Sequence, residues 1–315
     1  MNRIKLCGFL TIVCFVFMIL PNTASADETE LQITQGQTNQ TNKIEFGLRI
    51  MGGGFLLMQN DINDHIQGMN DSINDFAGLI PDVSVDSEFK QVNMGMDFSG
   101  ELLIHFMPQF SIGIGAGYIS AGKESTAELS DNTGEYQDMT LDPRVSAIPI
   151  TLSFYYGIPV GSMIDVVLNA GAGYYLGTIN YDMILEYGDP GSSFEEIDTW
   201  SAQSNTLGFL GGIDFEFGFS SNMVFVLGAR GRYVKFTDLT GDLEWEYSSS
   251  WGASGSGTDK DQTLWFGNQE MFTGKEYPQL TLSDSKPTGS NWSDVRKAEI
   301  SLSGIIFQAG IKVTF

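Results

Sequence analysis

The last eighteen residues, 298–315, read AEISLSGIIFQAGIKVTF and decide the fold. Counting back from the end in steps of two gives an almost wholly apolar set, and the residues between are mostly small or polar. The apolar set is Phe315, Val313, Ile311, Ala309, Phe307 and Ile305. Because successive side chains of a β-strand point to opposite faces, this segment predicts a strand with a different environment on each side. The strand of a soluble sheet and the strand of a membrane barrel would both show this pattern. The rest of the chain decides between these two folds.

Seven earlier segments show the same alternation. They span 43–58, 92–107, 110–118, 145–156, 164–176, 207–219 and 223–236. The connections between them alternate in length: 59–91, 121–144, 177–205 and 237–296 are long, whereas the intervening turns are short. Outer-membrane barrels have an even number of strands, short periplasmic turns and long external loops. The sequence therefore predicts an all-β fold, an eight-stranded antiparallel transmembrane β-barrel with both termini in the periplasm. The alternative is a secreted soluble barrel with an apolar interior.

Aromatic residues mark the ends of these segments. Near the short turns lie Phe106, Phe110, Tyr155, Tyr156, Phe217, Phe219 and Phe315, and near the long connections lie Tyr118, Tyr174, Tyr175 and Tyr233. Aromatic side chains gather at both membrane–water interfaces of such barrels. The positions predict two interfacial girdles and favour the cell outer membrane as the location.

The N-terminus reads as an export signal. Arg3 and Lys5 precede an uncharged apolar run, 6–20, and Ala24-Ser25-Ala26 is a small-residue cleavage site. The run is short for a membrane anchor and ends at Pro21. We therefore expect a signal peptide at 1–26, a polar flexible leader at 27–42 and the barrel domain at 43–315.

Charge and cysteine content narrow the partners. Removing the signal leaves 14 basic and 39 acidic residues, a net charge of −25. Such a chain repels phosphate backbones, so no nucleic-acid partner is expected. Both cysteines, Cys7 and Cys14, lie in the signal, so the mature chain has no disulfide and no cysteine metal site.

The first long connection contains a helical period. Its apolar residues are spaced four, three, four, three and four apart: Ile62, Ile66, Met69, Ile73, Phe76 and Ile80. This spacing predicts one stripe of an amphipathic helix that Pro81 ends. The helix either packs on its own barrel or caps the barrel mouth and meets a membrane or partner. In a later segment, Pro149 cannot donate a ladder hydrogen bond, which predicts a bulge near the rim.

Charged residues on the small, polar faces are expected to point into the lumen. The predicted ion-pair network is Arg49, Asp97, Glu101, Asp214, Glu216, Arg230 and Arg232, with Lys312 on the same side. A narrow barrel is filled by side chains, and buried charges must be paired because a bare one costs several kcal/mol. The network is either a structural plug or the lining of a gate or narrow polar pore.

Catalysis is not expected from these residues. The chain has two histidines, His65 and His105. Ser99 and His105 share a strand face but lie about 20 Å apart at ~3.3 Å per residue, too far to hydrogen-bond. His65 stands alone beside the helical stripe, and the acidic loops lack the spacing of a calcium-binding loop. We predict no enzyme, no catalytic residue, no cofactor and no metal site.

Five tryptophans fall in the long connections. They are Trp200, Trp245, Trp251, Trp265 and Trp292. They either order these loops by packing or form a recognition surface.

The chain resembles the small outer-membrane β-barrel proteins, the group that includes the OmpA transmembrane domain, opacity proteins and OmpW-like proteins. The resemblance rests on IGIGAGY at 112–118, IPITLSFYY at 148–156 and the final aromatic strand. It implies outer-membrane lipid and lipopolysaccharide as surroundings, and recognition of Phe315 by the barrel-assembly machinery. Unlike full OmpA-type proteins, the chain is not expected to carry a peptidoglycan-binding domain after the last strand. The function expected is a structural or surface-interaction role, and the alternative is a narrow channel for small or apolar solutes.

Overall fold

The structure is a computed structural model, and it describes residues 44–315 except 59, 162 and 272–273. The expected signal peptide, 1–26, and leader, 27–42, lie outside the described residues. Among the described residues the chain forms sixteen strands and one helix, and fourteen of the strands belong to one antiparallel sheet.

Part of this sheet closes on itself. The pairings run from β1 to β3, β4, β6, β7, β8, β9 and β16, and β16 pairs again with β1. These strands, called the ring below, are β1 (Glu45–Leu57), β3 (Met94–Met107), β4 (Phe110–Gly122), β6 (Tyr136–Pro159), β7 (Ile164–Asp189), β8 (Ser192–Gly218), β9 (Met223–Tyr233) and β16 (Gly304–Thr314). Each of the eight segments expected from the sequence overlaps one of these strands, and the segments 223–236 and 298–315 also include short strands at 235–236 and 300–301.

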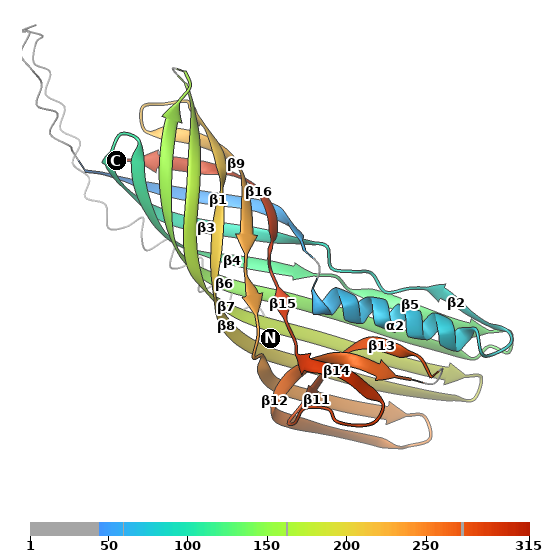
Figure 1. The fold of residues 1–315 in the computed structure, drawn as a ribbon. Coiled ribbons are helices and arrows are strands. Elements are labelled where there is room, and N and C mark those ends of the chain that lie inside the picture. The colour runs from blue at the N-terminus through green and yellow to red at the C-terminus, as the bar shows by residue number, and fades with distance from the viewer. Residues whose placement is uncertain (1–43, 59, 162, 272–273) are drawn as a thin grey trace, which may run out of the picture. The chain divides into compact units, whose positions relative to one another are not determined.

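The remaining strands of the sheet, together with one helix, lie on one side of the ring (Figure 1). They are α2 (Asp61–Ala77), β2 (Val83–Ser87), β5 (Ser125–Asp131), β11 (Thr240–Ser249), β12 (Ser254–Glu270), β13 (Glu276–Ser283) and β14 (Trp292–Lys297). A separate two-stranded sheet joins β10 (Lys235–Phe236) and β15 (Ile300–Ser301). Figure 1 shows β6, β7 and β8 running from the ring into this region, which we call the extension, where they meet β5 and β11.

The prediction of an eight-stranded barrel is wrong, because the sheet of the described residues contains fourteen strands, of which only eight form the ring. Three of the connections expected as loops, 121–144, 177–205 and 237–296, are largely β-structure. Their polar composition suggested loops because the polar residues line the outer face of strands that continue beyond the ring.

Along a single strand, the apolar side chains change from the outward face of the sheet in the ring to the inward face in the extension. In the ring part of β7, outward side chains such as Leu168 are apolar and exposed (42%), whereas the inward Asn169 is buried. In the extension part of β7 the inward Ile179 and Tyr181 are buried, and the outward positions include Asp182 and Glu186. The strand keeps its alternation, but the apolar face moves from outside to inside.

Pro149 is accommodated without a bulge. The pairing of β4 with β6 skips Pro149 and its neighbour Ile148, while Ala116↔Ile150 and Ile119↔Ala147 keep one register. On the other side, Pro149 stays paired in register with β7. The missing N–H thus falls on a local interruption of the β4–β6 ladder, and the expected bulge is wrong.

The predicted helix is confirmed as α2, although it ends at Ala77 before Pro81. Asn60 caps its N-terminus, because its side chain accepts hydrogen bonds from the N–H groups of Ile62 and Asn63. The helix packs against β13 and β2, which stand at the two ends of the strand order of the sheet. Within the described residues, no helix is long and apolar enough to cross a membrane.

The interior of the extension is an apolar core. Its members come from α2, the extension strands and the adjoining end of the ring, and they include Phe55, Ile66, Leu141, Ile179 and Leu280. A smaller cluster of Leu103, Tyr155 and Val167 lies in the ring.

Candidate functional site

The interior of the ring is polar and charged. Arg49 comes from β1, Glu101 from β3, Asp214 and Glu216 from β8, and Arg230 from β9. All five are at least nine-tenths buried, although they lie on strands whose opposite faces are exposed and apolar. The alternation that exposes apolar side chains on one face thus directs these charges inward.

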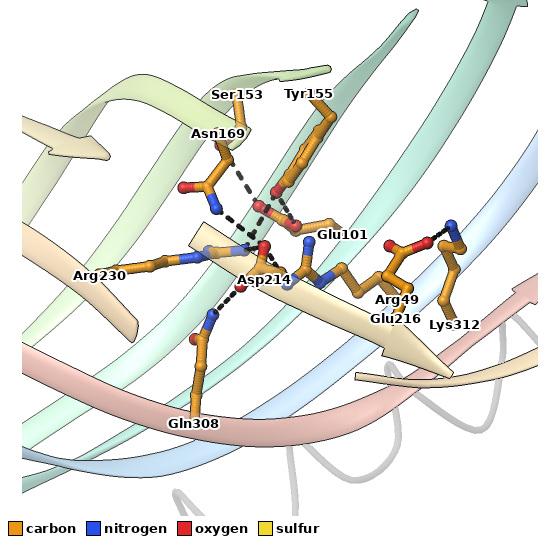
Figure 2. A network of polar contacts seen from close by, with 10 residues as sticks. All are labelled: Arg49, Glu101, Ser153, Tyr155, Asn169, Asp214, Glu216, Arg230, Gln308 and Lys312. Carbon is orange, nitrogen blue, oxygen red and sulfur yellow. Dashed lines mark hydrogen bonds and ion pairs between the residues drawn. The ribbon is translucent and has the colours of Figure 1, made fainter. Parts of the chain in front are cut away.

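Asp214 is the centre of the network (Figure 2). One carboxylate oxygen, Oδ2, accepts from Arg49 Nη2 at 2.8 Å, from Arg230 Nη2 at 3.3 Å and from Asn169 Nδ2 at 2.8 Å. The second oxygen, Oδ1, accepts from Gln308 Nε2 at 3.4 Å. Asp214 itself is fully buried. Two cations and two amides therefore replace the water that this carboxylate would bind in solution.

Gly228 makes room for this carboxylate. It lies directly opposite Asp214 in the pairing of β8 with β9. A Cβ at position 228 would lie 2.0 Å from Asp214 Oδ1. Only glycine leaves the space that the carboxylate occupies.

A second part of the network surrounds Tyr155. Its hydroxyl donates to Glu101, which also accepts from Ser153 Oγ at 3.4 Å. The guanidinium groups of Arg49 and Arg230 lie 5.1 Å and 5.9 Å from the centre of the tyrosine ring. The Tyr155 side chain thus contacts both arginines through its aromatic face and Glu101 through its hydroxyl.

Two further ion pairs lie in the ring interior. Lys312 pairs with Glu216, and Arg232 pairs with Asp97. Arg232 also lies 4.5 Å from the centre of the Phe55 ring and donates from Nε to the Leu302 carbonyl at 2.9 Å. Arg232 therefore borders the apolar core of the extension.

A cavity of about 40 Å³ lies inside the ring. Its lining combines charged residues such as Asp97, Glu101 and Arg232 with Pro149 and Ile119. At roughly 10–15 Å³ per site, such a space is large enough for a few water molecules and too small for an organic solute.

The structure brings together the charged residues selected from the sequence, and Arg232 pairs with Asp97 among them. Arg49 and Arg230 share Asp214, and Glu101 bonds to Tyr155. The uncharged members of the network were not predicted from the sequence; they are Ser153, Tyr155, Asn169 and Gln308. Their inward position follows from the same alternation, which is the signal that could have identified them.

Two aromatic residues were misplaced. Tyr155 and Tyr175 were expected in the interfacial girdles, but they are 4% and 1% exposed inside the molecule. Their neighbours Tyr156 and Tyr174 are the exposed ones, at 38% and 44%. Proximity to a turn was the wrong criterion, because the parity of the position decides which side a strand residue occupies.

The buried face of α2 forms a second polar arrangement within the extension. His65 Nε2 lies 2.9 Å from the Tyr181 hydroxyl, and the Leu280 N–H donates to His65 Nδ1 at 3.2 Å. Because Nδ1 accepts, the proton of the neutral ring is on Nε2. Burial lowers the pKa of His65 to about 4 and raises the pKa of Tyr181. His65 thus holds the helix to the interior as a neutral side chain.

The N-terminal end of α2 is fixed by Asp61. Arg296 donates to both of its carboxylate oxygens at 2.7 Å, and the Glu299 N–H donates to it at 2.7 Å. The Arg296 guanidinium also lies 4.6 Å from the centre of the Phe266 ring. An arginine that pairs with a carboxylate and lies over an aromatic ring recurs in this chain.

Most of the tryptophans are not in loops. Trp200 lies in β8, Trp245 in β11, Trp265 in β12 and Trp292 in β14, whereas Trp251 lies in the turn between β11 and β12. Trp200 stacks on Tyr181 with ring centres 4.9 Å apart and packs against the apolar core. The expectation that all five occupy loops is corrected accordingly.

Comparison with known proteins gives one solved structure to report. No family model and no curated protein matches the chain. The crystal structure of outer membrane protease OmpT from Escherichia coli matches with 10% sequence identity and a TM-score of 0.28, over 86% of this chain and 95% of that chain.

The prediction that the chain is not an enzyme is withdrawn, because the matched solved structure is that of a protease. At this TM-score and identity, the likeness assigns no activity or catalytic residue to the chain either.

Proposed function

We propose that the ring crosses an outer membrane and that the extension stands outside it as a surface for interaction with other molecules. The observation that carries the proposal is the apolar outward face of the ring. Phe209, Phe215 and Leu227, for example, are 63%, 46% and 42% exposed, with charged residues behind them. Large exposed apolar surfaces mark contact with a membrane or another protein.

The dimensions of this apolar face suit a bilayer. On β7 it runs from Ile164 to Leu176, both exposed, and the next outward position is Thr178. Twelve residue steps at ~3.3 Å give about 40 Å of strand, and a tilt of about 45° reduces this to roughly 28 Å of height. The apolar band of outer-membrane barrels is ~25 Å tall. Outer-membrane lipid and lipopolysaccharide are the partners proposed for this face.

The proposed orientation places the chain ends in the periplasm. Thr314 N–H donates to the Asn222 carbonyl at 2.9 Å, so the C-terminus lies beside a short turn. Phe315, which is 55% exposed, exchanges backbone hydrogen bonds with Phe46 of β1. The exposed terminal aromatic residue supports recognition of Phe315 by the barrel-assembly machinery.

The lumen network acts in this proposal as a structural plug. The carboxylates of Asp214 and Glu101 balance the guanidinium groups of Arg49 and Arg230, and the apolar core of the extension lies beyond them. The cavity of about 40 Å³ would not pass an organic solute. These features favour the surface role over the narrow channel.

Cysteine labelling tests the orientation, because residues 27–315 contain no cysteine. Ser193→Cys is exposed near the turn between β7 and β8, and Ser221→Cys is exposed in a short turn. A membrane-impermeant maleimide should label Ser193→Cys in intact cells, and Ser221→Cys only after the outer membrane is permeabilised. Equal labelling of both variants in intact cells, or their recovery as dissolved periplasmic proteins, would contradict the proposal.

A further inference from the structure

An aromatic platform continues the inner face of the extension beyond its apolar core. Trp245 and Tyr247 lie on the same face of β11 as Leu243, which packs against the core. Their ring planes are 9° from parallel, with centres 6.3 Å apart. Phe194 and Trp251 extend the row at 6.2 Å and 6.4 Å with angles of 26° and 13°.

Glycines on β12 keep these rings flat. A Cβ at Gly257 would lie 2.5 Å from the Trp245 ring, and a Cβ at Gly255 would lie 2.8 Å from the Tyr247 ring. Each ring therefore rests with one face on the sheet. Both side chains remain partly exposed.

Two carboxylates lie on the neighbouring strand β8, on the same face of the sheet as these rings. Asp198 is directly opposite Trp245 in the pairing of β11 with β8, and Glu196 is directly opposite Tyr247. Directly opposite residues of an antiparallel pair have Cβ atoms about 5 Å apart on the same face. Within the described part of the chain, neither carboxylate has an ion pair or hydrogen bond. Burial and the nearby Glu196 raise the pKa of Asp198.

Elsewhere in the chain, an aromatic ring and a nearby carboxylate are both contacted by one arginine side chain. Arg296 lies over Phe266 and pairs with Asp61, as described above. Arg49 lies over Tyr155 and pairs with Asp214, and Arg232 lies over Phe55 and pairs with Asp97. A guanidinium group suits both contacts because it is planar, stacks on aromatic faces and offers several donors to a carboxylate.

We propose that this face binds a peptide segment that carries arginine at two alternate positions, one at Trp245 and Asp198 and the other at Tyr247 and Glu196. The separation of the rings, 6.3 Å, fits side chains two residues apart on one face of an extended peptide, which are about 6.6–6.8 Å apart. The net charge of −23 favours a cationic partner over an anionic one.

This inference rests on the proposed surface role and names the partner class for it. Binding is measured on the purified full chain in detergent, which does not depend on its orientation in a cell. Failure of the peptide to bind would overturn the inference alone, whereas failure of the labelling experiment would overturn the membrane proposal.

The probe is a fluorescein-labelled peptide of sequence Ser-Arg-Ser-Arg-Ser, followed by fluorescence anisotropy. It should bind more tightly than Ser-Arg-Arg-Ser-Ser, which has the same charge but directs neighbouring arginines to opposite sides. It should also bind more tightly than Ser-Lys-Ser-Lys-Ser, because an ammonium group lacks the planar fork. Equal binding of the three peptides would overturn the proposal.

Isosteric variants localise the site. Asp198→Asn and Glu196→Gln should each weaken binding roughly ten-fold to a hundred-fold, the range for a lost charged hydrogen bond. Glu195→Gln is the matched control, because Glu195 is exposed on the opposite face of the same strand. It should leave the affinity within about two-fold, since an exposed charge acts only through screened attraction. A comparable loss in Glu195→Gln would show non-specific attraction and overturn the proposal.

The aromatic contribution is tested separately. Trp245→Leu keeps an apolar side chain but removes the flat ring, and should weaken binding about three-fold or more through the lost cation–π contact. Folding of every variant is checked by the mobility shift between unheated and boiled samples on a gel. An unchanged affinity in folded Trp245→Leu would contradict the role of the platform.

Discussion

Asp214 shows how the ring interior tolerates charge. A carboxylate without water costs several kcal/mol, and this one is compensated by two guanidinium groups and two side-chain amides. Arg49 and Arg230 depend on it in return, since it is the anion that both contact. Loss of the carboxylate therefore leaves two buried cations rather than one broken bond.

The Asp214→Asn variant should be strongly destabilised, because Arg49 and Arg230 would lose their shared anion. Breaking a buried ion pair by removing one partner costs about 3–5 kcal/mol. The measurement is the urea midpoint for loss of the heat-modifiable gel band. Glu186→Gln, at an exposed position of the extension, should shift the free energy of unfolding by less than about 0.5 kcal/mol. Equal midpoints for Asp214→Asn and the parent protein would refute the role of this hub.

Gly228→Ala tests the space around the same carboxylate. The added Cβ would lie 2.0 Å from Asp214 Oδ1, so either the strand or the carboxylate must shift. Overpacking of this kind costs about 1–3 kcal/mol. Gly231→Ala, in the same strand, is the control because its nearest atom would be 3.9 Å away. The idea fails if both alanine variants unfold at the same urea concentration.

The helix α2 is held to the extended segment before β3 by the side-chain amides of two asparagines. Asn63 donates to the Val92 carbonyl at 3.0 Å and accepts from the Val92 N–H at 2.8 Å. Asn70, seven residues later, does the same with Phe89, at 3.0 Å and 2.9 Å. Two turns of helix separate them, so they lie on one face and hold the extended chain before β3.

Replacing Asn63 or Asn70 by alanine should loosen this docking. Each change leaves a buried backbone N–H and carbonyl without partners, at a cost of about 1–3 kcal/mol. Hydrogen exchange at the Phe89 and Val92 amides should accelerate most. Gln67→Ala is the control, because Gln67 bonds only to the exposed Asp71 among the contacts described. Unchanged exchange at Phe89 in Asn70→Ala would contradict this account.

His65 should make the extension sensitive to acid. Its pKa is about 4 in the folded chain and 6.5 in the unfolded chain, so the unfolded state binds more protons between these values. Stability is therefore full above pH 6.5 and falls as the pH drops towards 4, by roughly 3 kcal/mol at most. Protonation of Nδ1 would also remove the acceptor of the Leu280 N–H.

Exchange of the α2 amides, followed from pH 7 to pH 4.5 and corrected for intrinsic rates, measures this effect. His65→Gln should lower stability at neutral pH but remove the part of the pH dependence that belongs to His65. The same slope in both proteins would rule out His65 as its source.

The ring strands and α2 could be predicted from sequence because their apolar residues recur at one spacing, every second residue in the strands and every three or four residues in the helix. Leu207 to Phe217 alternates cleanly, and Ile62, Ile66, Ile73 and their neighbours follow one helical stripe. The extension could not be predicted, because in it Asp138, Glu186 and Glu195 occupy the outer face and suggested solvated loops. Tyr155, Asn169 and Gln308 were missed because the search for lumen residues considered charge alone.

The position along the strands at which the outward face stops being apolar marks the edge of the surface that we propose faces lipid. Leu168 and Ile184 both point outward from β7, but the first lies in the ring and the second in the extension. The proposed membrane surrounds only the ring. The same substitution should therefore have different costs at these two positions.

Leu168→Arg should lower the free energy of unfolding in lipid by about 2–4 kcal/mol, the cost of a cation on the lipid face near the midplane. Ile184→Arg should cost much less, since water can reach that position. Both are compared by urea titration in phospholipid vesicles. Similar costs at the two positions would place the membrane boundary elsewhere or exclude a bilayer.

The inversion of faces along β6, β7 and β8 has a consequence for how the chain can be cut. Three continuous strands belong to both regions, so the extension is not a detachable module: separating it from the ring would cut β6, β7 and β8 within their pairing. In each of these strands, the alternation of inward and outward side chains also continues without a break from the ring into the extension. A single residue inserted into β7 near Leu176 would, unless a bulge absorbed it, reverse every side chain beyond that point. Carboxylates would then crowd the dry interior while tyrosines faced the water.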